Sequence, residues 1–287
     1  MNHRQLAALG FSSPWIIAFL LLWLFPIGYS LVLSFTDYQL FRESHYIGLE
    51  NYRNLFADSG FLQAMKNTFI FIGGTVPLTT VIALGLALLV HKPFRGRTLF
   101  RAGFFLPWLT SIVVIALVFS NLFQRGGYIS LLAELINLTP PEHGFLYDYG
   151  TALYAIMGMD VWMSVGYYML IFLAGLQAIP TELYEAAEIA GASRWRQFVS
   201  ITLPLLRPVG LYIIVINTIK SFQVFTEIFV MTKGKFDTAT LVYFIYETSL
   251  TTDFKFGYAS AAAYILFLII AVFSMIQFFL MRRGGQP

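Results

Sequence analysis

The chain has 287 residues, of which 58% are hydrophobic, 17% aromatic and only 11% charged. In an ordinary water-soluble domain about a quarter of the residues are charged, and disordered chains are poor in aromatic residues. The composition therefore excludes both classes and indicates a polytopic membrane protein. The absence of cysteine also excludes a disulfide framework and a thiolate metal site.

Six apolar segments are long enough to cross a bilayer, which takes about 20 residues per helix. The predicted spans are 14–35, 68–90, 102–123, 152–178, 209–231 and 257–281. Four of them contain no charged side chain, whereas the fourth contains Asp160 and the fifth contains Lys220 and Glu227. We therefore expect an all-α protein with six transmembrane helices. Prolines in the first three spans predict kinks around an internal cavity.

The basic residues of the short connections predict the orientation. With a cytoplasmic N-terminus, the inner segments contain basic residues in clear excess over three acidic ones, Glu182, Glu185 and Glu188. The turn from Lys92 to Arg101 contains basic residues and no acidic one. The net charge of +3 then divides into about +7 inside, about −3 outside and the three intramembrane charges. Both termini are predicted to be cytoplasmic, in a multi-pass protein of the cell (inner) membrane.

The connection 180–204, between the fourth and fifth spans, predicts two short helices joined by a turn. Thr181 is the expected N-cap of the first helix, and Glu182 favours its positive end. Gly191 suits a left-handed position, Ser193 can cap the second helix, and Pro204 is expected to end it. Such a structured connection is typical of a docking element. An amphipathic hairpin that only lies on the lipid headgroups is the alternative.

Within this connection the order Glu185-Ala186-Ala187, Gly191 and Ile201-x-Leu203-Pro204 resembles the EAA loop of ATP-binding-cassette (ABC) importer permeases. Further segments are similar to carbohydrate-type permeases of maltose-like and glycerol-3-phosphate-like importers. They are Ile47-Gly48-Leu49-Glu50-Asn51-Tyr52 with Asn67-Thr68, Arg95-Gly96-Arg97 before Phe105-Leu106-Pro107-Trp108, and Leu173 to Pro180.

The resemblance implies a type I ABC importer permease fold in a single domain over 1–287, with its core at about 68–281 and the coupling loop at 180–204. Contact with the ATPase is implied for Glu185, Ala186, Ala187, Gly191, Leu203 and Pro204. The implied partners are a second permease subunit, two ATPase subunits, an extracytoplasmic sugar-binding protein and the lipid bilayer, but no nucleic acid. The chain itself would hold no cofactor. ATP and Mg²⁺ would bind the partner ATPase subunits, in keeping with the absence of a P-loop motif from this sequence.

One segment departs from the family pattern. Where such permeases usually have Gly-Gly-Pro after the fifth span, this chain has Thr232-Lys233-Gly234-Lys235-Phe236. The resemblance therefore does not extend to the contact that the binding protein would make at this position.

Polar side chains inside spans are costly and face a cavity or a partner helix. The candidate substrate-binding residues are Asp160, Ser164, Tyr167, Asn217, Lys220 and Ser221. The first three recur at i, i+4 and i+7 on one helical face, and all but Lys220 fall near positions that the resemblance implies for a sugar site. Two alternatives for Asp160 and Lys220 stay open: a structural ion pair, or contact with the partner permease.

The leading hypothesis is thus a non-enzymatic permease subunit that moves a sugar by alternating access, driven by ATP hydrolysis in partner subunits. A self-contained, ion-coupled secondary transporter or channel is the second hypothesis, with Asp160, Lys220 and Glu227 as its relay. An intramembrane enzyme is disfavoured because the sequence has neither H-E-x-x-H nor G-x-S-x-G.

Overall fold

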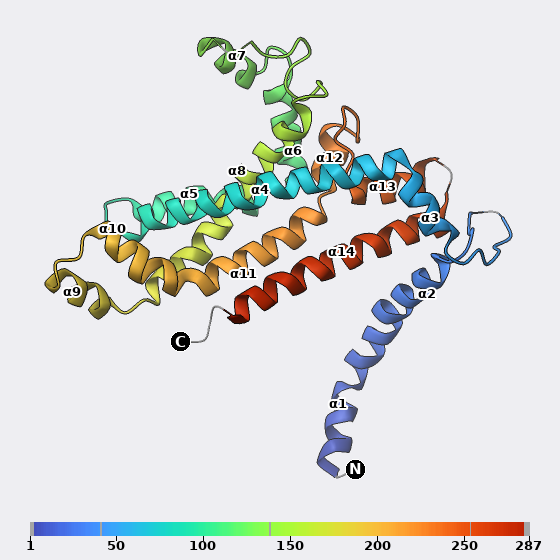
Figure 1. Ribbon diagram of the computed structural model, residues 1–287, viewed down its shortest axis with the longest axis horizontal. Coiled ribbons are helices and arrows are strands. Elements are labelled where there is room, and N and C mark those ends of the chain that lie inside the picture. Colours follow the sequence, from blue (N-terminus) through green and yellow to red (C-terminus); the bar gives the residue numbers. More distant parts are fainter. Residues whose placement is uncertain (1–2, 41, 138, 253, 284–287) are drawn as a thin grey trace. The chain divides into compact units, whose positions relative to one another are not determined.

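The computed structural model describes residues 3–40, 42–137, 139–252 and 254–283 (Figure 1). Their contacts divide the chain into two compact units, each considered on its own. The first unit is Met1–Leu62 with Phe244–Leu268, and the second is Gln63–Tyr243 with Ile269–Pro287. The described ranges contain helices and no strand, apart from two isolated bridges that join Thr36 to Tyr46 and Gln124 to Gly144. The predicted all-α class is confirmed.

The helices follow one another in the order that Figure 1 labels. The first half contains α1 (His3–Phe19), η1 (Leu20–Leu24), α2 (Phe25–Leu33), α3 (Glu50–Ala57), α4 (Ser59–His91), α5 (Arg97–Leu109), α6 (Ile112–Phe123) and α7 (Tyr128–Leu135). The second half contains α8 (Ala152–Gln177), α9 (Thr181–Ile189), α10 (Arg194–Gln197), η2 (Phe198–Thr202), α11 (Leu203–Phe222), α12 (Thr226–Met231), α13 (Leu241–Glu247), η3 (Thr248–Thr252) and α14 (Phe256–Arg283). The three η segments are single π-helical turns.

In the described ranges, five helical stretches are long and apolar enough to cross a membrane, and the bent pair of α5 and α6 brings the number to the predicted six when it is counted as one broken span. The five stretches are Phe11–Leu33, Ser59–His91, Ala152–Gln177, Arg194–Phe222 and Phe256–Leu280. The predicted third span, 102–123, is instead two helices, α5 and α6, that meet at 97°. Pro107 removes one backbone donor from the last turn of α5, and the Thr110 hydroxyl donates to the Leu106 carbonyl. With Thr110 in an extended conformation, the chain turns instead of continuing as one straight helix.

The predicted fifth span, 209–231, was wrong at both ends. The helix ends at Phe222, where Gln223 leaves helical geometry, and Thr226–Met231 forms the separate helix α12. At the other end, helical structure runs without a break from Arg194 through Pro204 to Phe222. The prediction that Pro204 ends the second helix of the connection was therefore wrong.

A π-turn explains how the helix passes through Pro204. In η2 the Leu203 amide donates to the carbonyl of Phe198, five residues earlier, and Pro204 follows directly. The same device occurs at η1, where the Phe25 amide donates to the Leu20 carbonyl immediately before Pro26. A π-turn places its bonds one residue out of the α-helical register, which removes the need for a donor at the proline.

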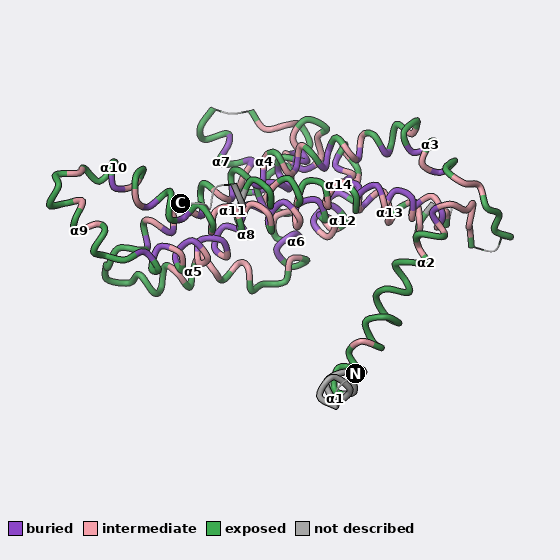
Figure 2. Tube along the Cα trace, turned by 60° about the horizontal axis from the view of Figure 1, so that its bottom comes forward, coloured by how far each residue is buried: buried purple, intermediate pink, exposed green. Residues whose placement is uncertain are grey.

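Helix α8 is the buried centre of the second unit, and most of its residues are coloured as buried in Figure 2. It packs against α5, α6, α11 and α12. Gly166 makes the α5 contact possible, because a Cβ at this position would lie 1.7 Å from the Phe104 carbonyl oxygen. Two apolar clusters flank this contact, one around Phe71 and Ile156 and the other around Tyr168 and Ile213.

In the first unit, the extended chain that follows α2 is fastened to α3. The Asn51 side-chain amide donates to the carbonyls of Ser34 at 2.9 Å and Thr36 at 2.8 Å, and the hydroxyls of Tyr52 and Ser34 lie 2.8 Å apart. By contrast, η1 and α2 contain no buried residue. Their exposed Leu, Phe and Trp side chains suit contact with lipid or with a partner helix.

Candidate functional site

A buried ion pair joins α8 to α11 inside the second unit. The Lys220 ammonium donates to Asp160 Oδ1 at 2.8 Å and to Ser164 Oγ at 2.7 Å. Asp160 and Ser164 lie one turn apart on α8, so the two contacts are made on one helical face. The Asp160 side chain is only 2% exposed and that of Lys220 is 28% exposed. The structure thus brings together three of the six candidate substrate residues.

An aromatic pair lies beside this ion pair. The rings of Tyr167 and Trp108 are stacked, with centroids 4.4 Å apart and planes 12° apart, and Lys220 Nζ lies 5.2 Å from the Trp108 ring centroid. Trp108 was missed as a candidate residue, although the Phe-Leu-Pro-Trp segment that contains it had been singled out. Its contact with Lys220 depends on the bend after α5. The proline of this span predicted a kink, but not one as sharp as 97°.

The remaining two candidates, Asn217 and Ser221, face the interior of the second unit. The Ser221 hydroxyl lies 3.2 Å from the Thr75 hydroxyl on α4. Asn217 is fully buried, yet neither polar atom of its amide has a hydrogen-bond partner among the described residues, and the same holds for the Thr79 hydroxyl. A buried polar group without a partner costs about 1–3 kcal/mol. A residue kept at such a cost is a candidate for function rather than for stability.

A pocket of about 390 Å³ lies beside the ion pair, with Lys220 in its lining. Its polar lining comes from Lys220, Gln223, Thr226 and Glu227, and its apolar lining includes Ile219 and Phe225. Glu227 is only 3% exposed and stands on α12, just beyond the end of α11. The pocket thus combines hydroxyl-matching groups with apolar surface. Lys220 is the candidate residue that connects the pocket to the buried pair.

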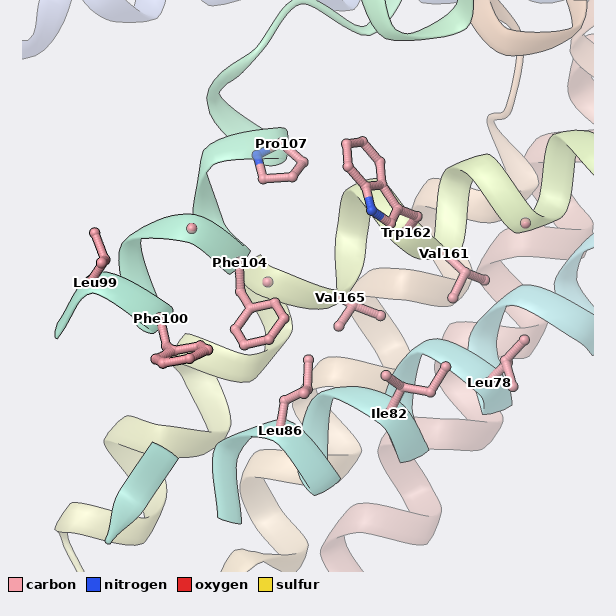
Figure 3. Close-up of a pocket in the computed structure, with 13 residues that line it drawn as sticks. Leu78, Ile82, Leu86, Leu99, Phe100, Phe104, Pro107, Val161, Trp162 and Val165 are labelled. Atoms are coloured by element: carbon pink, nitrogen blue, oxygen red, sulfur yellow. The ribbon is translucent and has the colours of Figure 1, made fainter. Parts of the chain in front are cut away.

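A larger cavity of about 790 Å³ lies between α4, α5 and α8 (Figure 3). The labelled side chains that line it are almost all hydrocarbon, among them Leu86, Phe104 and Val165, and none of its lining residues is titratable. Apart from the indole N–H of Trp162, the side chains of this surface offer no donors or acceptors for a polar substrate, and the surface suits lipid acyl chains. The smaller pocket beside Lys220 is therefore the better candidate for recognition.

The connection between α8 and α11 forms the expected helix–turn–helix. Gly191 is left-handed with φ +75°, and the Ser193 hydroxyl accepts the Arg196 amide at 3.3 Å, so both predictions are confirmed. The N-cap prediction was wrong by one residue, because Pro180 stands at the cap and Thr181 begins α9. The backbone of Pro180 is extended, with ψ 133°, so Pro180 stands just outside the helix and Thr181 is its first residue.

Helix α9 has an exposed surface and is joined to η2 by a hydrogen bond between two hydroxyl groups. Glu185 and Ala186 are exposed, Ala187 is half-buried, and Leu203 and Pro204 are exposed on α11. The hydroxyls of Tyr184 and Thr202 lie 2.8 Å apart, across the turn. This contact links α9 to η2, which continues into α11, the helix that contains Lys220.

The segment that departs from the Gly-Gly-Pro pattern forms a tight loop after α12. Lys233, Gly234 and Phe236 all have positive φ, and the Tyr243 hydroxyl donates to the Lys233 carbonyl at 2.7 Å. A Cβ at Gly234 would lie 2.2 Å from the Tyr243 ring. The loop therefore has a defined conformation of its own.

Residues 79–283 match the family described as the inner membrane component of binding-protein-dependent transport systems. The chain belongs to this family. Among its relatives, a probable ABC transporter permease, YesP of Bacillus subtilis, is 36% identical over 97% of this chain and 91% of its own length. The lactose transport system permease LacF of Rhizobium radiobacter is 34% identical over 95% of this chain and 93% of its own.

The fold of this permease is also that of a solved structure. A chain of the bacterial alginate ABC transporter, crystallised with an alginate pentasaccharide-bound periplasmic protein, superposes with a TM-score of 0.85. The two chains are 23% identical, and the match covers 98% of this chain and 95% of the other. The expected identity as an ABC importer permease and as a multi-pass membrane protein is thus confirmed. The orientation of its termini stays a prediction.

Proposed function

We propose that this permease is the translocation subunit for a sugar or oligosaccharide that an extracytoplasmic binding protein delivers. The names of its relatives support the substrate class, since LacF is named for lactose transport. The alginate transporter of similar fold was crystallised with its periplasmic protein, which supports a binding protein as a partner. A second permease subunit and two ATPase subunits complete the proposed assembly.

The observation on which the coupling mechanism rests is a continuous helical connection. The 29 residues Arg194–Phe222 form one helical stretch, about 40 Å long at 1.5 Å per residue. One end is held to the exposed helix α9 by the contact between Tyr184 and Thr202, and the other end presents Lys220 to the pocket. In the proposed mechanism, ATP-driven closure of the ATPase subunits moves α9 and thereby the walls of the substrate pocket.

The proposed ATPase contact comprises Glu185, Ala186, Ala187, Gly191, Leu203 and Pro204. The small alanines let another backbone approach closely, and Gly191 is needed because its left-handed φ disfavours any side chain. ATP and Mg²⁺ bind the partner subunits in this proposal, and both termini of the permease face the cytoplasm.

The proposed substrate residues are Asp160, Ser164, Tyr167, Asn217, Lys220 and Ser221. Asp160, Ser164, Asn217 and Ser221 are buried here, whereas Tyr167 and Lys220 are partly exposed. In the proposed cycle the buried groups reach the sugar only when neighbouring helices move away from them, while Lys220 stays paired with Asp160. Alternating access would then expose a polar surface toward one side of the membrane at a time.

The coupling half of this proposal is tested with a Glu185→Lys, Gly191→Asp double variant, because the lysine reverses a charge and the aspartate strains a left-handed position. We expect sugar uptake to fall to background while the variant still reaches the membrane, as measured by transport of radiolabelled sugar and by immunoblotting of membranes. A Glu142→Lys variant, in the connection between α7 and α8, is the control. Normal uptake by the double variant would sink the coupling assignment.

A further inference from the structure

The pocket beside Lys220 indicates the charge of the substrate. We propose that the sugar carried by this permease is uncharged and that Glu227 is the residue that excludes anionic sugars. The inference rests on the proposed function, because it concerns the same pocket. A lysine inside a membrane span could by itself bind an anion, but the contacts of Lys220 argue against that role.

Two of the three hydrogen-bond donors of Lys220 are already used within the chain. An ammonium group has three donors, of which one bonds to Asp160 Oδ1 at 2.8 Å and one to Ser164 Oγ at 2.7 Å. The ammonium also lies over the Trp108 ring, 5.2 Å from its centroid, where a cation is attracted to the π face. Turning Lys220 toward a substrate anion would leave the Asp160 carboxylate buried and unpaired, which is strongly unfavourable.

The other charges of the site add to this exclusion. Glu227 lines the pocket next to Lys220 and is 3% exposed. Among the described residues, no basic side chain forms an ion pair with Glu227, and the nearby Lys220 is paired with Asp160. Lys220, Asp160 and Glu227 together have a net charge of −1, or zero when Glu227 holds a proton. In neither state is a positive charge left over for an anion.

The rest of the pocket matches an uncharged sugar. Gln223 offers an amide, Thr226 a hydroxyl and Glu227 a carboxylate that accepts hydrogen bonds from hydroxyl groups. Ile219 and Phe225 supply apolar surface for the C–H face of a sugar ring. The carboxylate of an anionic sugar, such as a uronic acid, would instead lie against the carboxylate of Glu227, in a pocket that has no unpaired basic side chain.

Direct binding to the assembled transporter separates this selection from that of the binding protein. The transporter is purified with its partner permease and ATPase subunits but without the binding protein. Binding of a neutral glucose trisaccharide is then compared with binding of a galacturonate trisaccharide, which carries three carboxylates. We expect the neutral sugar to bind tighter by about tenfold or more, because like-charge contacts cost that much in a poorly hydrated site.

Variants of the pocket residues test which side chain causes the preference for the neutral trisaccharide. Glu227→Gln should narrow the preference for the neutral sugar, while Glu134→Gln, a control carboxylate on α7, should leave it unchanged. A double variant, Asp160→Asn with Lys220→Met, removes the ion pair without leaving an unpaired charge. Because both residues are proposed to bind the sugar, we expect the affinity for both trisaccharides to fall, while the ratio of the two affinities should still favour the neutral one. An unchanged preference in Glu227→Gln would refute the role of Glu227.

Two other outcomes would overturn the inference in distinguishable ways. If the anionic trisaccharide binds as tightly as the neutral one and its binding is lost in the double variant, Lys220 is an anion ligand and only the inference fails. If neither trisaccharide binds, the carbohydrate assignment fails and the inference fails with it.

Discussion

The central residue-scale feature is that Lys220 is paired with Asp160 inside the protein. The sequence placed Asp160 and Lys220 within predicted spans and left a structural ion pair and a pathway role as alternatives. The structure joins them at 2.8 Å, which makes the pair a structural link between α8 and α11. Lys220 also lines the pocket, so the same residue belongs to the wall that a substrate would meet.

Removing one member of this pair should be costly. Asp160→Ala leaves the Lys220 ammonium without its counter-charge, and we expect a loss of about 3–5 kcal/mol of stability, as for other broken buried pairs. Replacing both, as Asp160→Leu with Lys220→Met, should restore most of that loss because no charge is then buried alone. Thermal unfolding in detergent measures both variants. A double variant as unstable as Asp160→Ala would contradict this explanation.

Replacing Asn217 by an apolar residue should not lower the stability, in contrast to Asp160→Ala. Its amide has no hydrogen-bond partner in the described part of the chain, so Asn217→Leu breaks no bond and removes a desolvation cost of about 1–3 kcal/mol. We expect unchanged or higher thermal stability together with a loss of sugar uptake, since the amide is proposed to bind the substrate. Full uptake across substrate concentrations would show that other residues line the pathway.

At the scale of elements, the predictions succeeded where local chemistry decides the outcome. The left-handed Gly191 and the Ser193 cap were predicted because each depends on one residue and its neighbours. The passage of the helix through Pro204 was not, because it depends on a π-turn that no single residue specifies. A kink at the proline of the third span was predicted. Its sharpness, which divides the span into two helices at 97°, was not, since apolar composition continues through it from 102 to 123.

The packing of α5 against α8 offers an element-scale test with a matched control. Gly166→Ala should push the helices apart, because the new methyl would overlap the Phe104 carbonyl oxygen, and we expect a loss of about 1–3 kcal/mol. Gly158→Ala lies on the same helix with nothing within 4 Å of its Cβ position, so it should be neutral or slightly stabilising. Thermal unfolding of the two variants compares them. Equal stability of the two variants would show that the contact between α5 and α8 accommodates the added methyl group without a loss of stability.

At the scale of the whole molecule, the fold class and family could be predicted from composition and from one ordered motif. The pocket could not, because its walls come from α11, α12 and the start of α6, which meet only after the bend and the end of α11 are known. The ion pair of Lys220 with Asp160, 60 positions apart, was one of the alternatives that the sequence left open, because opposite charges inside spans favour one another as partners. Sequence periodicity alone does not select it at that separation.

The charge asymmetry predicts an orientation that single cysteines can report. The chain contains no cysteine, so Glu188→Cys and Glu142→Cys each introduce one thiol. We expect a membrane-impermeant maleimide to label Glu142→Cys in intact cells and Glu188→Cys only after the membrane is opened, because the basic connections remain cytoplasmic. Labelling in the reverse order would contradict the predicted topology.

The most direct test of the account is transport by the reconstituted assembly. The permease, its partner permease and two ATPase subunits are placed in proteoliposomes, and uptake of a neutral trisaccharide is measured with the binding protein present. We predict uptake that requires ATP and is unaffected by dissipating ion gradients. Uptake that an ion gradient drives through this chain alone, without ATP, would contradict the account.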